Sequence, residues 1–510
     1  MSHWITLPII LPLLSGLILL FGARAGMGVQ RAFATIATAG LLAVSLVLLA
    51  QSADGDYQVY ALGDWAPPFG IVLVLDRLSA LLLVVTATLA LPVLVYALRG
   101  NDAAGKYFHA LFQFQLMGLN GAFLTGDLFN LFVFFEVLLI ASYALLMQGN
   151  GPARARAGLH YVVLNLAGSS LFLFAVGTLY GITGTLNMAD LAVKVAELGE
   201  RDAAVVRAGA LLLLVVFALK AALLPLYFWL PRAYAAAQPA VAAVFAIMTK
   251  VGVYAILRVY VIIFGVDAGL LANTAWPWLW PLALVTLSLG AIGALAARDL
   301  RTLIGYLVVV SVGTLLAGAA LATPEALDAV LYYLLHTTLV TGGLFLLAGM
   351  VTEQRGAVAD RLQPGAPVSQ PAVLGGLFLL GAVAVAGLPP MSGFLGKVLL
   401  LSAVPPGAQA AWLWSVVLIG GLLVLVALSR AGSILFWRTL DQPAAPARVD
   451  GIRLGSALAL IAASPLLVVF AAPVTDFTRA TAEQLLNPAA YVAAVLGEQS
   501  TGTAIAGVAP

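Results

Sequence analysis

The sequence contains no cysteine and little charge. Of its 510 residues, 9% are charged and 63% are hydrophobic. Without cysteine there can be no disulfide, no thiolate metal site and no iron–sulfur cluster, because each needs cysteine sulfur. Soluble domains carry about 25% charged residues. The composition therefore excludes a soluble protein and predicts an all-α membrane protein that crosses the bilayer many times.

Signatures of several other chemistries are missing as well. The 50 glycines form no phosphate-binding loop, and no HExxH or similar metal-ligand spacing occurs. No basic patch indicates a nucleic-acid partner. In apolar segments, glycines mostly allow close packing of helices. We therefore expect no catalytic residue, no metal site, no bound cofactor and no nucleic acid.

Long apolar runs fill most of the chain. At about 20 residues per crossing, they predict one transmembrane domain, residues 1–475, and an external tail, residues 476–510. The first run, His3–Leu20, has no basic flank before it and no obvious cleavage site, so it reads as a retained helix rather than a signal peptide. The fourteen predicted helices are 4–22, 31–51, 73–98, 107–125, 127–147, 158–181, 205–229, 239–265, 276–297, 302–322, 325–350, 372–401, 411–437 and 452–474.

Basic residues collect in alternate loops. If the N-terminus is external, the internal loops hold 15 of the 24 Lys and Arg residues, whereas the external segments are mainly acidic. Because short loops rich in Lys and Arg stay on the cytoplasmic side, both termini are predicted to be external. The fifteen internal residues are Arg24, Arg31, Arg99, Lys106, Arg154, Arg156, Arg232, Arg298, Arg301, Arg355, Arg361, Arg430, Arg438, Arg448 and Arg453.

Two predicted helices are interrupted by proline. Pro225 breaks the seventh helix, and Pro389 and Pro390 break the twelfth. Proline removes a backbone hydrogen bond from a helix, and a membrane tolerates such a break where it is buried in protein or lines a polar cavity. Helices five apart in the chain run in opposite directions, so the two breaks indicate an inverted repeat of the kind found in transporters.

Ionisable residues near the middle of apolar helices are the second unusual feature. A lysine at this depth costs about 2.5–3.5 kcal/mol to insert, which indicates a function. We interpret these residues as a proton relay in which Lys220 releases its proton when its predicted partner Glu136 withdraws, and His336 exchanges protons near neutral pH. The predicted relay consists of Glu136, Lys220, Lys250, His336 and Lys397.

Hydroxyl groups on the same helices are candidates for holding the water that connects the charges. They are Thr249, Ser311, Thr314, Thr337, Thr338 and Ser392. Each could instead be a simple hydrogen bond between helices. Two further alternatives stay open at this point: Glu136 and Lys220 could form a purely structural ion pair, and His336 could be a neutral histidine bonded to a neighbouring hydroxyl.

Other ionisable groups are expected to lie outside the relay. His109 and His160 occur at internal helix ends and are expected to face water or lipid headgroups. Asp76 and Arg77, at the start of the third helix, are expected to form a local charge pair.

Three ordered motifs resemble a known family. Leu219–Tyr234 (LKAALLPLYFWLPRAY), Met248–Arg258 (MTKVGVYAILR) and Gly387–Lys397 (GLPPMSGFLGK) resemble the antiporter-like membrane subunits. These subunits are shared by respiratory complex I, membrane-bound hydrogenases and Mrp-type cation/proton antiporters. The resemblance covers nearly the whole transmembrane chain. It implies a fourteen-helix core with two inverted five-helix repeats, residues 107–265 and 276–437, discontinuous helices 7 and 12, and separate helices at 4–98 and 452–474.

Five positions place the chain nearer one branch of that family. Tyr227, Tyr234 and Ser311 stand where complex I subunits usually have histidine, and Arg232 stands where aspartate is common. Lys397 occupies a position where one complex I subunit has glutamate. Together these residues resemble the D-type branch of the Mrp antiporter subunits.

This resemblance implies a function and a set of partners. The chain would be a non-enzymatic, ion-translocating subunit of an electrogenic sodium/proton antiporter in a bacterial plasma membrane, working with a homologous large subunit and small membrane subunits. Glu136 and Lys220 would be the essential pair, Lys250 the link, and His336 with Lys397 the second half-channel. The alternative is a proton-pumping subunit of respiratory complex I or a membrane-bound hydrogenase, which would make the chain part of a redox-driven translocase.

Overall fold

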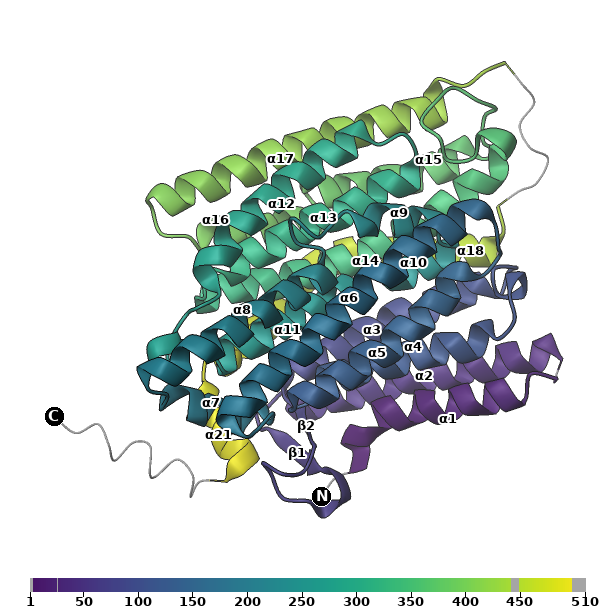
Figure 1. Cartoon of the computed structure of the whole chain (residues 1–510). Coiled ribbons are helices and arrows are strands. Elements are labelled where there is room, and N and C mark those ends of the chain that lie inside the picture. The colour runs from purple at the N-terminus through teal and green to yellow at the C-terminus, as the bar shows by residue number, and fades with distance from the viewer. Residues whose placement is uncertain (1–2, 25, 442–448, 498–510) are drawn as a thin grey trace.

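Long helices lying side by side make up nearly all of the chain (Figure 1). The structure, a computed structural model, describes residues 3–24, 26–441 and 449–497. The helices up to residue 262 are η1 (His3–Thr6), α1 (Leu7–Phe21), α2 (Met27–Ser52), η2 (Leu62–Asp64), α3 (Arg77–Ala97), η3 (Asp102–Ala104), α4 (Phe108–Leu124), α5 (Leu128–Met147), α6 (Pro152–Thr183), α7 (Met188–Ala196), α8 (Glu200–Ala221), α9 (Trp229–Ala236), α10 (Pro239–Phe245) and α11 (Met248–Ile262).

The second half of the chain continues the same pattern. Its helices are η4 (Gly269–Leu271), α12 (Trp276–Ala296), α13 (Leu300–Ala319), α14 (Pro324–Gln354), η5 (Gly356–Val358), α15 (Pro371–Ala386), α16 (Ser392–Ser402), α17 (Ala408–Gly432), η6 (Ser433–Trp437), α18 (Gly451–Ile461), α19 (Ala463–Val469), α20 (Ala471–Leu485) and α21 (Pro488–Leu496). Part of the predicted tail, residues 498–510, and the predicted internal residue Arg448 lie outside the described residues.

The described helices confirm a multi-pass membrane protein. Twelve of the described helical stretches are long and apolar enough to cross a bilayer. Two predicted crossings are absent from that set because α4 has only 17 residues, several of them polar, and because α15 and α16 are the short halves of a broken helix. Twelve crossings are thus shown for the described chain, and the total of fourteen stays a prediction.

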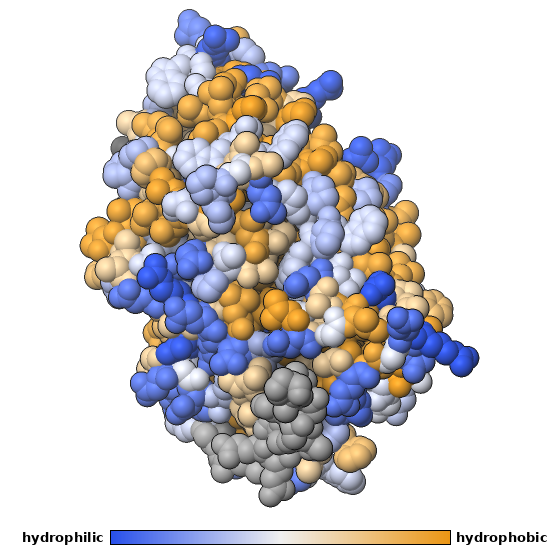
Figure 2. All heavy atoms as spheres, turned by 90° about the vertical axis from the view of Figure 1, so that its left-hand side faces the viewer, coloured by the Kyte–Doolittle hydropathy of each residue, from blue (hydrophilic) through white to orange (hydrophobic). Residues whose placement is uncertain are grey.

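A β-hairpin marks one end of the bundle, which we call the hairpin end. Strands β1 (Gln58–Ala61) and β2 (Val72–Leu75) pair antiparallel near the bottom of Figure 1, where α21 packs against β1 and α7 packs against α21. Hydrophilic residues gather on this end between hydrophobic flanks (Figure 2). The third helix was predicted to begin at residue 73, but Val72–Leu75 pair with β1, so α3 begins only at Arg77.

The centre of the bundle is formed by α14, α10 and α11. Neighbouring helices completely bury the most apolar 18-residue stretch of α14. They also completely bury the most apolar 18-residue stretch of the crossing formed by α10 and α11. By contrast, only a third of the corresponding 18-residue stretch is buried in the crossings that contain α1, α2 and α17. Their exposed residues are mainly apolar, as expected of surfaces that face lipid or a partner subunit.

Both predicted breaks are present. Helix α8 ends at Ala222 (φ 64°), and α9 starts only at Trp229. Helix α15 likewise ends at Gly387 (φ 79°), before α16 starts at Ser392. In each case the end residue is left-handed, a common way to terminate a helix.

Two matching loop pairs support the inverted repeat. Asp127 caps α5 and pairs as an isolated bridge with Asn187 near the hairpin end. Asp299 caps α13 and pairs in the same way with Arg361 near the opposite end. The loop before the fifth helix thus resembles the loop before the tenth, five helices later and at the other end. The boundaries of the repeats, 107–265 and 276–437, stay a prediction.

Candidate functional site

The first group of predicted residues joins α5, α6 and α8. Ser169 on α6 donates a hydrogen bond to the Glu136 carboxylate on α5. The Lys220 ammonium on α8 lies 3.5 Å from the same hydroxyl oxygen, and 3.3 and 3.4 Å from the side-chain and backbone oxygens of Asn165. The Lys220 nitrogen also lies 5.8 Å from the centre of the Phe135 ring. A lysine and a carboxylate are thereby connected through one hydroxyl.

The two predicted partners are connected indirectly. Among the described side chains, Glu136 and Lys220 form no ion pair, because the Ser169 hydroxyl stands between them. Sequence reasoning missed Ser169 and Asn165. Four residues, about one helical turn, separate them on α6, and that spacing was the only signal that they share a face.

Glycine brings the two lysine-bearing helices together. Gly252, two residues after Lys250 on α11, packs directly on the end of α8. A Cβ atom at position 252 would lie 2.8 Å from both the Ala221 Cα and the Lys220 carbonyl carbon, closer than packed atoms normally come. The missing side chain therefore lets the backbone next to Lys220 touch the helix that carries Lys250.

The break after Lys220 is held by two side chains. The indole of Trp229 donates to the Leu219 carbonyl oxygen at 3.2 Å, and the Thr286 hydroxyl of α12 accepts from the Leu224 amide at 2.9 Å. These bonds satisfy backbone groups that a continuous helix would have paired internally. Pro225 therefore lies in a supported turn, as a broken membrane helix requires.

Lys250 forms the second group with Ser311. Its side chain is fully buried at the start of α11, and its ammonium lies 3.4 Å from the Ser311 hydroxyl of α13. The adjacent Thr249 hydroxyl is also buried and has no hydrogen-bond partner among the described residues. The Ser311 hydroxyl on α13 thus connects Lys250 to a helix of the second half of the bundle.

His336 on α14 begins the third group. Its Nδ1 lies 2.7 Å from the Ser392 hydroxyl, which in turn lies 2.9 Å from the hydroxyl of Ser464 on α19. The sequence identified the first two residues but not Ser464, which lies beyond the predicted repeats. The short contact with Ser392 suits a proton relay, and it equally suits a neutral histidine bonded to a hydroxyl.

The side chain of Lys397, on α16, reaches back across the second break to α15. Its ammonium donates to the Ala386 carbonyl at the end of α15 at 2.7 Å, so a residue of α16 caps the other half of the broken helix. A Cβ at Gly387 would come 2.8 Å from that nitrogen, so glycine leaves the space for it. A cavity of about 280 Å³ between α16 and α17, lined by Lys397, Phe394 and other residues, opens beside it.

The remaining predicted hydroxyls are less closely connected to the charges. Thr314 and Thr338 donate to backbone carbonyls one turn earlier in their own helices, at 2.9 and 2.7 Å. Thr337 is buried on α14 next to His336 in the chain. The structure therefore brings Ser311 and Ser392 directly to predicted relay residues, but does not do so for these three threonines.

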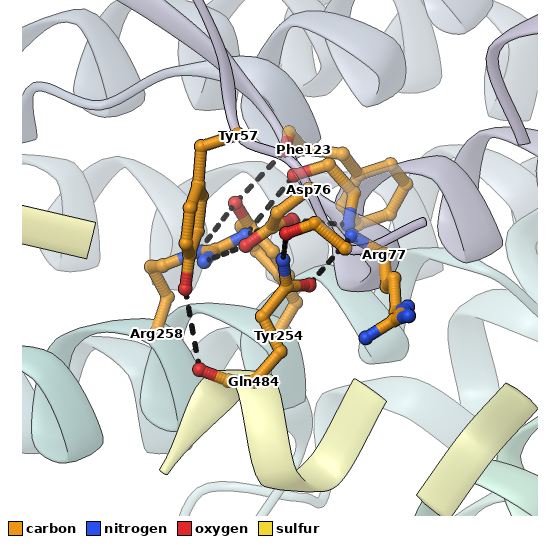
Figure 3. A network of polar contacts seen from close by, with 9 residues as sticks. Tyr57, Asp76, Arg77, Phe123, Tyr254, Arg258 and Gln484 are labelled. Carbon is orange, nitrogen blue, oxygen red and sulfur yellow. Dashed lines mark hydrogen bonds and ion pairs between the residues drawn. The ribbon is translucent and has the colours of Figure 1, made fainter. Parts of the chain in front are cut away.

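A buried ion pair that the sequence assigned wrongly lies at the hairpin end (Figure 3). Asp76 binds Arg258 of α11 in two hydrogen bonds of 2.5 and 2.8 Å, whereas the prediction paired it with Arg77. Arg77 points away and donates to the Ala53 carbonyl. Arg258 also donates to the Tyr254 hydroxyl at 3.2 Å. Asp76 and Arg258 are 182 positions apart, so only the tertiary fold reveals the pair.

A second buried cluster corrects the prediction for His109. The imidazole is buried and lies 3.1 Å from the Asp102 carboxylate, which also accepts two hydrogen bonds from Arg31 at 2.6 and 2.9 Å. Burial opposes the charge on Asp102, but the hydrogen bonds from His109 and Arg31 outweigh it and lower the pKa of this carboxyl to about 2. His160, in contrast, is exposed as predicted. Within the described ranges, no three His, Asp or Glu side chains converge as a metal site would require.

Known proteins resemble this chain over its full length. Residues 125–425 match the family described as NADH:quinone oxidoreductase/Mrp antiporter, TM. A protein of Rhizobium meliloti (strain 1021), named as the D component of a probable K(+)/H(+) antiporter, is 42% identical over 99% of both chains. The D component of the Na(+)/H(+) antiporter of Bacillus subtilis (strain 168) is 39% identical over 98% of this chain and 100% of that protein.

Solved structures agree with these relatives. A chain of the Mrp complex from Dietzia sp. DQ12-45-1b superimposes with a TM-score of 0.88 at 28% identity, covering 98% of this chain and 100% of that one. A chain of respiratory complex I from Thermus thermophilus gives a TM-score of 0.78 at 27% identity, covering 94% of this chain and 99% of that one. Both structures are multisubunit assemblies.

Proposed function

The chain belongs to the NADH:quinone oxidoreductase/Mrp antiporter family, and from this we infer that it is the D-type, ion-translocating subunit of a multisubunit monovalent cation/proton antiporter. It is a transporter subunit and not an enzyme in its own right. It works in a bacterial plasma membrane with both termini external, alongside a homologous large subunit and small membrane subunits. Sodium is the cation expected, and potassium is the rival, because the two relatives are named for different cations.

The observation that supports this function best is the hydroxyl bridge between Glu136 and Lys220. Lys220 donates toward the Ser169 oxygen while Ser169 donates its own proton to the carboxylate. A proton can therefore pass from lysine to glutamate by a shift along two hydrogen bonds, without movement of either helix. When the carboxylate withdraws, the lysine loses that acceptor, and its buried charge becomes costly.

The later residues extend the path in the same manner. Lys250 donates toward the Ser311 hydroxyl, and His336 shares a hydrogen bond with Ser392, which shares another with Ser464. Ser311 replaces the histidine that complex I subunits usually have, so hydroxyls and water, with His336, make the link between Lys250 and Lys397. Lys397 is the terminal charge of the path, beside a cavity at the surface of the chain.

The alternative function is a proton-pumping subunit of a redox-driven complex. Both functions would use the same buried lysines to move protons. They differ in the energy source, which is an ion gradient for the antiporter and a redox reaction for the alternative. Tyr227, Arg232, Tyr234 and Ser311 favour the antiporter, and so do the full-length relatives named as D components of antiporters. A redox-driven subunit would purify with quinone- and iron–sulfur-binding partners.

Transport by the whole complex tests the proposal. In vesicles that contain the intact complex, the Lys220→Ala and Glu136→Ala variants are expected to lose proton-coupled efflux of sodium and of potassium. The matched control is Lys194→Ala, because Lys194 is a surface lysine that pairs locally with Asp190 at 2.9 Å. Full activity of either relay variant would exclude the relay. Absence of antiport from the wild-type complex would exclude the antiporter function.

A further inference from the structure

A basic pocket lies at the end of the bundle opposite the hairpin. It encloses about 730 Å³ between the start of α6, α9, the start of α13 and the segment 359–361. Five basic side chains and two carboxylates line it, together with apolar residues. The ionisable lining residues are Arg156, His160, Arg232, Asp299, Arg301, Asp360 and Arg361.

The carboxylates of the pocket are already engaged. Asp360 accepts hydrogen bonds from the Arg301 guanidinium at 3.0 and 3.1 Å and from its backbone amide at 3.0 Å. Asp299 accepts from the Thr302 amide as the cap of α13, at 2.8 Å. Asp360 is therefore paired with Arg301 through both carboxylate oxygens, whereas Asp299 forms no ion pair with an arginine among the described residues.

Three arginines of the pocket have no ion-pair partner among the described residues. Arg156, Arg232 and Arg361 come from three separate segments, are exposed, and have no side-chain hydrogen bond or ion pair within the part of the chain that the structure describes. Guanidinium groups converging on one cavity are suited to phosphate oxygens, which they bind in a planar, two-pronged geometry. The pocket therefore has the charge and the donors for a phosphate group.

An apolar surface leads away from the pocket along α6. Leu159, Val163 and Leu166 follow the pocket residues of this helix at intervals of about one turn, and each is more than half exposed. Phe228, which lines the pocket, is 51% exposed as well. A ligand that fills both regions has an anionic head and an apolar tail.

We propose that this pocket binds the phosphate headgroup of an anionic phospholipid whose acyl chains lie along α6. The pocket lies at the level where the transmembrane helices end, and this end carries the basic loops predicted to face the cytoplasm. Basic pockets between membrane helices on that side are suited to anionic lipid headgroups. An acidic segment of a partner subunit is the rival occupant, and the experiment below separates the two.

The bound lipid would act on the first relay group. Trp229 lines the pocket and donates to the carbonyl of Leu219, the residue before Lys220, and the Tyr161 ring packs 5.1 Å from the indole. Arg232 lies on the same short helix, α9. A headgroup held by Arg232 thereby holds α9, the second half of the broken helix, against the end of α8. This effect on transport rests on the proposed function, whereas the binding does not.

Lipid retention by the intact complex tests the binding. The experiment compares the wild-type complex with the double variant Arg232→Gln/Arg361→Gln. Each complex is reconstituted in vesicles of equal parts phosphatidylcholine and phosphatidylglycerol and purified again. Native mass spectrometry then measures the mass of lipid that stays bound. The control Arg24→Gln/Arg438→Gln removes two exposed arginines from the same end outside this pocket. We expect about fivefold weaker retention of phosphatidylglycerol for each pocket arginine removed, and none of this loss in the control.

Each other outcome overturns the proposal in a distinct way. Equal retention by the wild-type complex and the pocket variant excludes lipid binding here. Displacement of the lipid by inorganic phosphate at equal concentration identifies a free-anion site. Loss of a partner subunit from the pocket variant, with unchanged lipid, identifies a protein interface. None of these measurements depends on transport, so failure of the antiporter function would be seen separately, in the vesicle flux assay.

Discussion

Replacing Ser169 with alanine separates the hydroxyl bridge from the charges that it joins. The change leaves Glu136 and Lys220 in place and removes only the group that donates to one and accepts from the other. Hydrogen bonds to charged groups contribute about 1.5–3 kcal/mol. If proton transfer through the bridge limits transport, the loss corresponds to a rate about 10- to 100-fold lower, since each 1.36 kcal/mol is about tenfold.

The neighbouring serine provides a matched control. Ser170 is exposed and donates only to the Leu166 carbonyl of its own helix, at 3.1 Å. Ser170→Ala makes the same chemical change one position along α6 but does not touch the bridge. We expect its transport rate to stay at the wild-type level, and its vesicles to contain the same amount of assembled complex as those of Ser169→Ala.

The measurement is cation-driven proton flux in vesicles, followed across pH with the amount of complex determined in parallel. A Ser169→Ala complex that assembles normally and transports at the wild-type rate throughout the pH range would refute the bridge. Loss of assembly in Ser169→Ala alone would instead make the hydroxyl a packing group. A lowered rate with normal assembly is the result that the hydrogen-bond geometry predicts.

Two further variants test buried ion pairs outside the relay. Asp76→Asn leaves the Arg258 charge buried and without its ion-pair partner, so the free energy of unfolding of the purified complex should fall by about 3–5 kcal/mol, measured by thermal unfolding. The control is the same change at the exposed Asp64, which should leave the free energy of unfolding unchanged. Equal effects of the two variants would contradict the pairing. For Asp102, the pKa is lowered to about 2, so its stabilising contact with Arg31 is present above the ordinary aspartate pKa, about 4, and is lost as pH falls toward 2. The unfolding temperature of Asp102→Asn should therefore lie below that of the wild type at neutral pH and approach it below about pH 4, whereas a constant difference down to about pH 2 would contradict this assignment.

Local sequence signals were sufficient for the helices and their breaks. Apolar runs of about 20 residues are required by the bilayer, and proline in such a run removes a hydrogen bond that nothing in lipid can replace. The breaks at Pro225 and at Pro389–Pro390 were therefore visible in one sequence. Helix α3 was predicted to begin too early because Val72–Leu75 is as apolar as a helix, and only its pairing with β1 shows that it is a strand.

Local signals were insufficient for the contacts between helices. Ser169 and Ser170 are adjacent and chemically identical, yet one connects Glu136 to Lys220 and the other is exposed. Which of them faces the relay depends on the rotation of α6 against α5 and α8, and no local pattern records that rotation. The charges themselves could be found because a buried lysine is unusual wherever its helix lies.

The two breaks also differ in a way that their similar sequences conceal. Lys220 precedes its break and is held by a neighbouring helix through Asn165 and Ser169. Lys397 follows its break and donates back across it to the Ala386 carbonyl, at the negative end of the α15 dipole. Protonation or deprotonation of Lys220 would therefore change contacts between two helices. The same event at Lys397 would change a contact between the two halves of its own broken helix. The two broken helices end alike in a left-handed residue, but the two lysines contact different parts of the structure around their breaks.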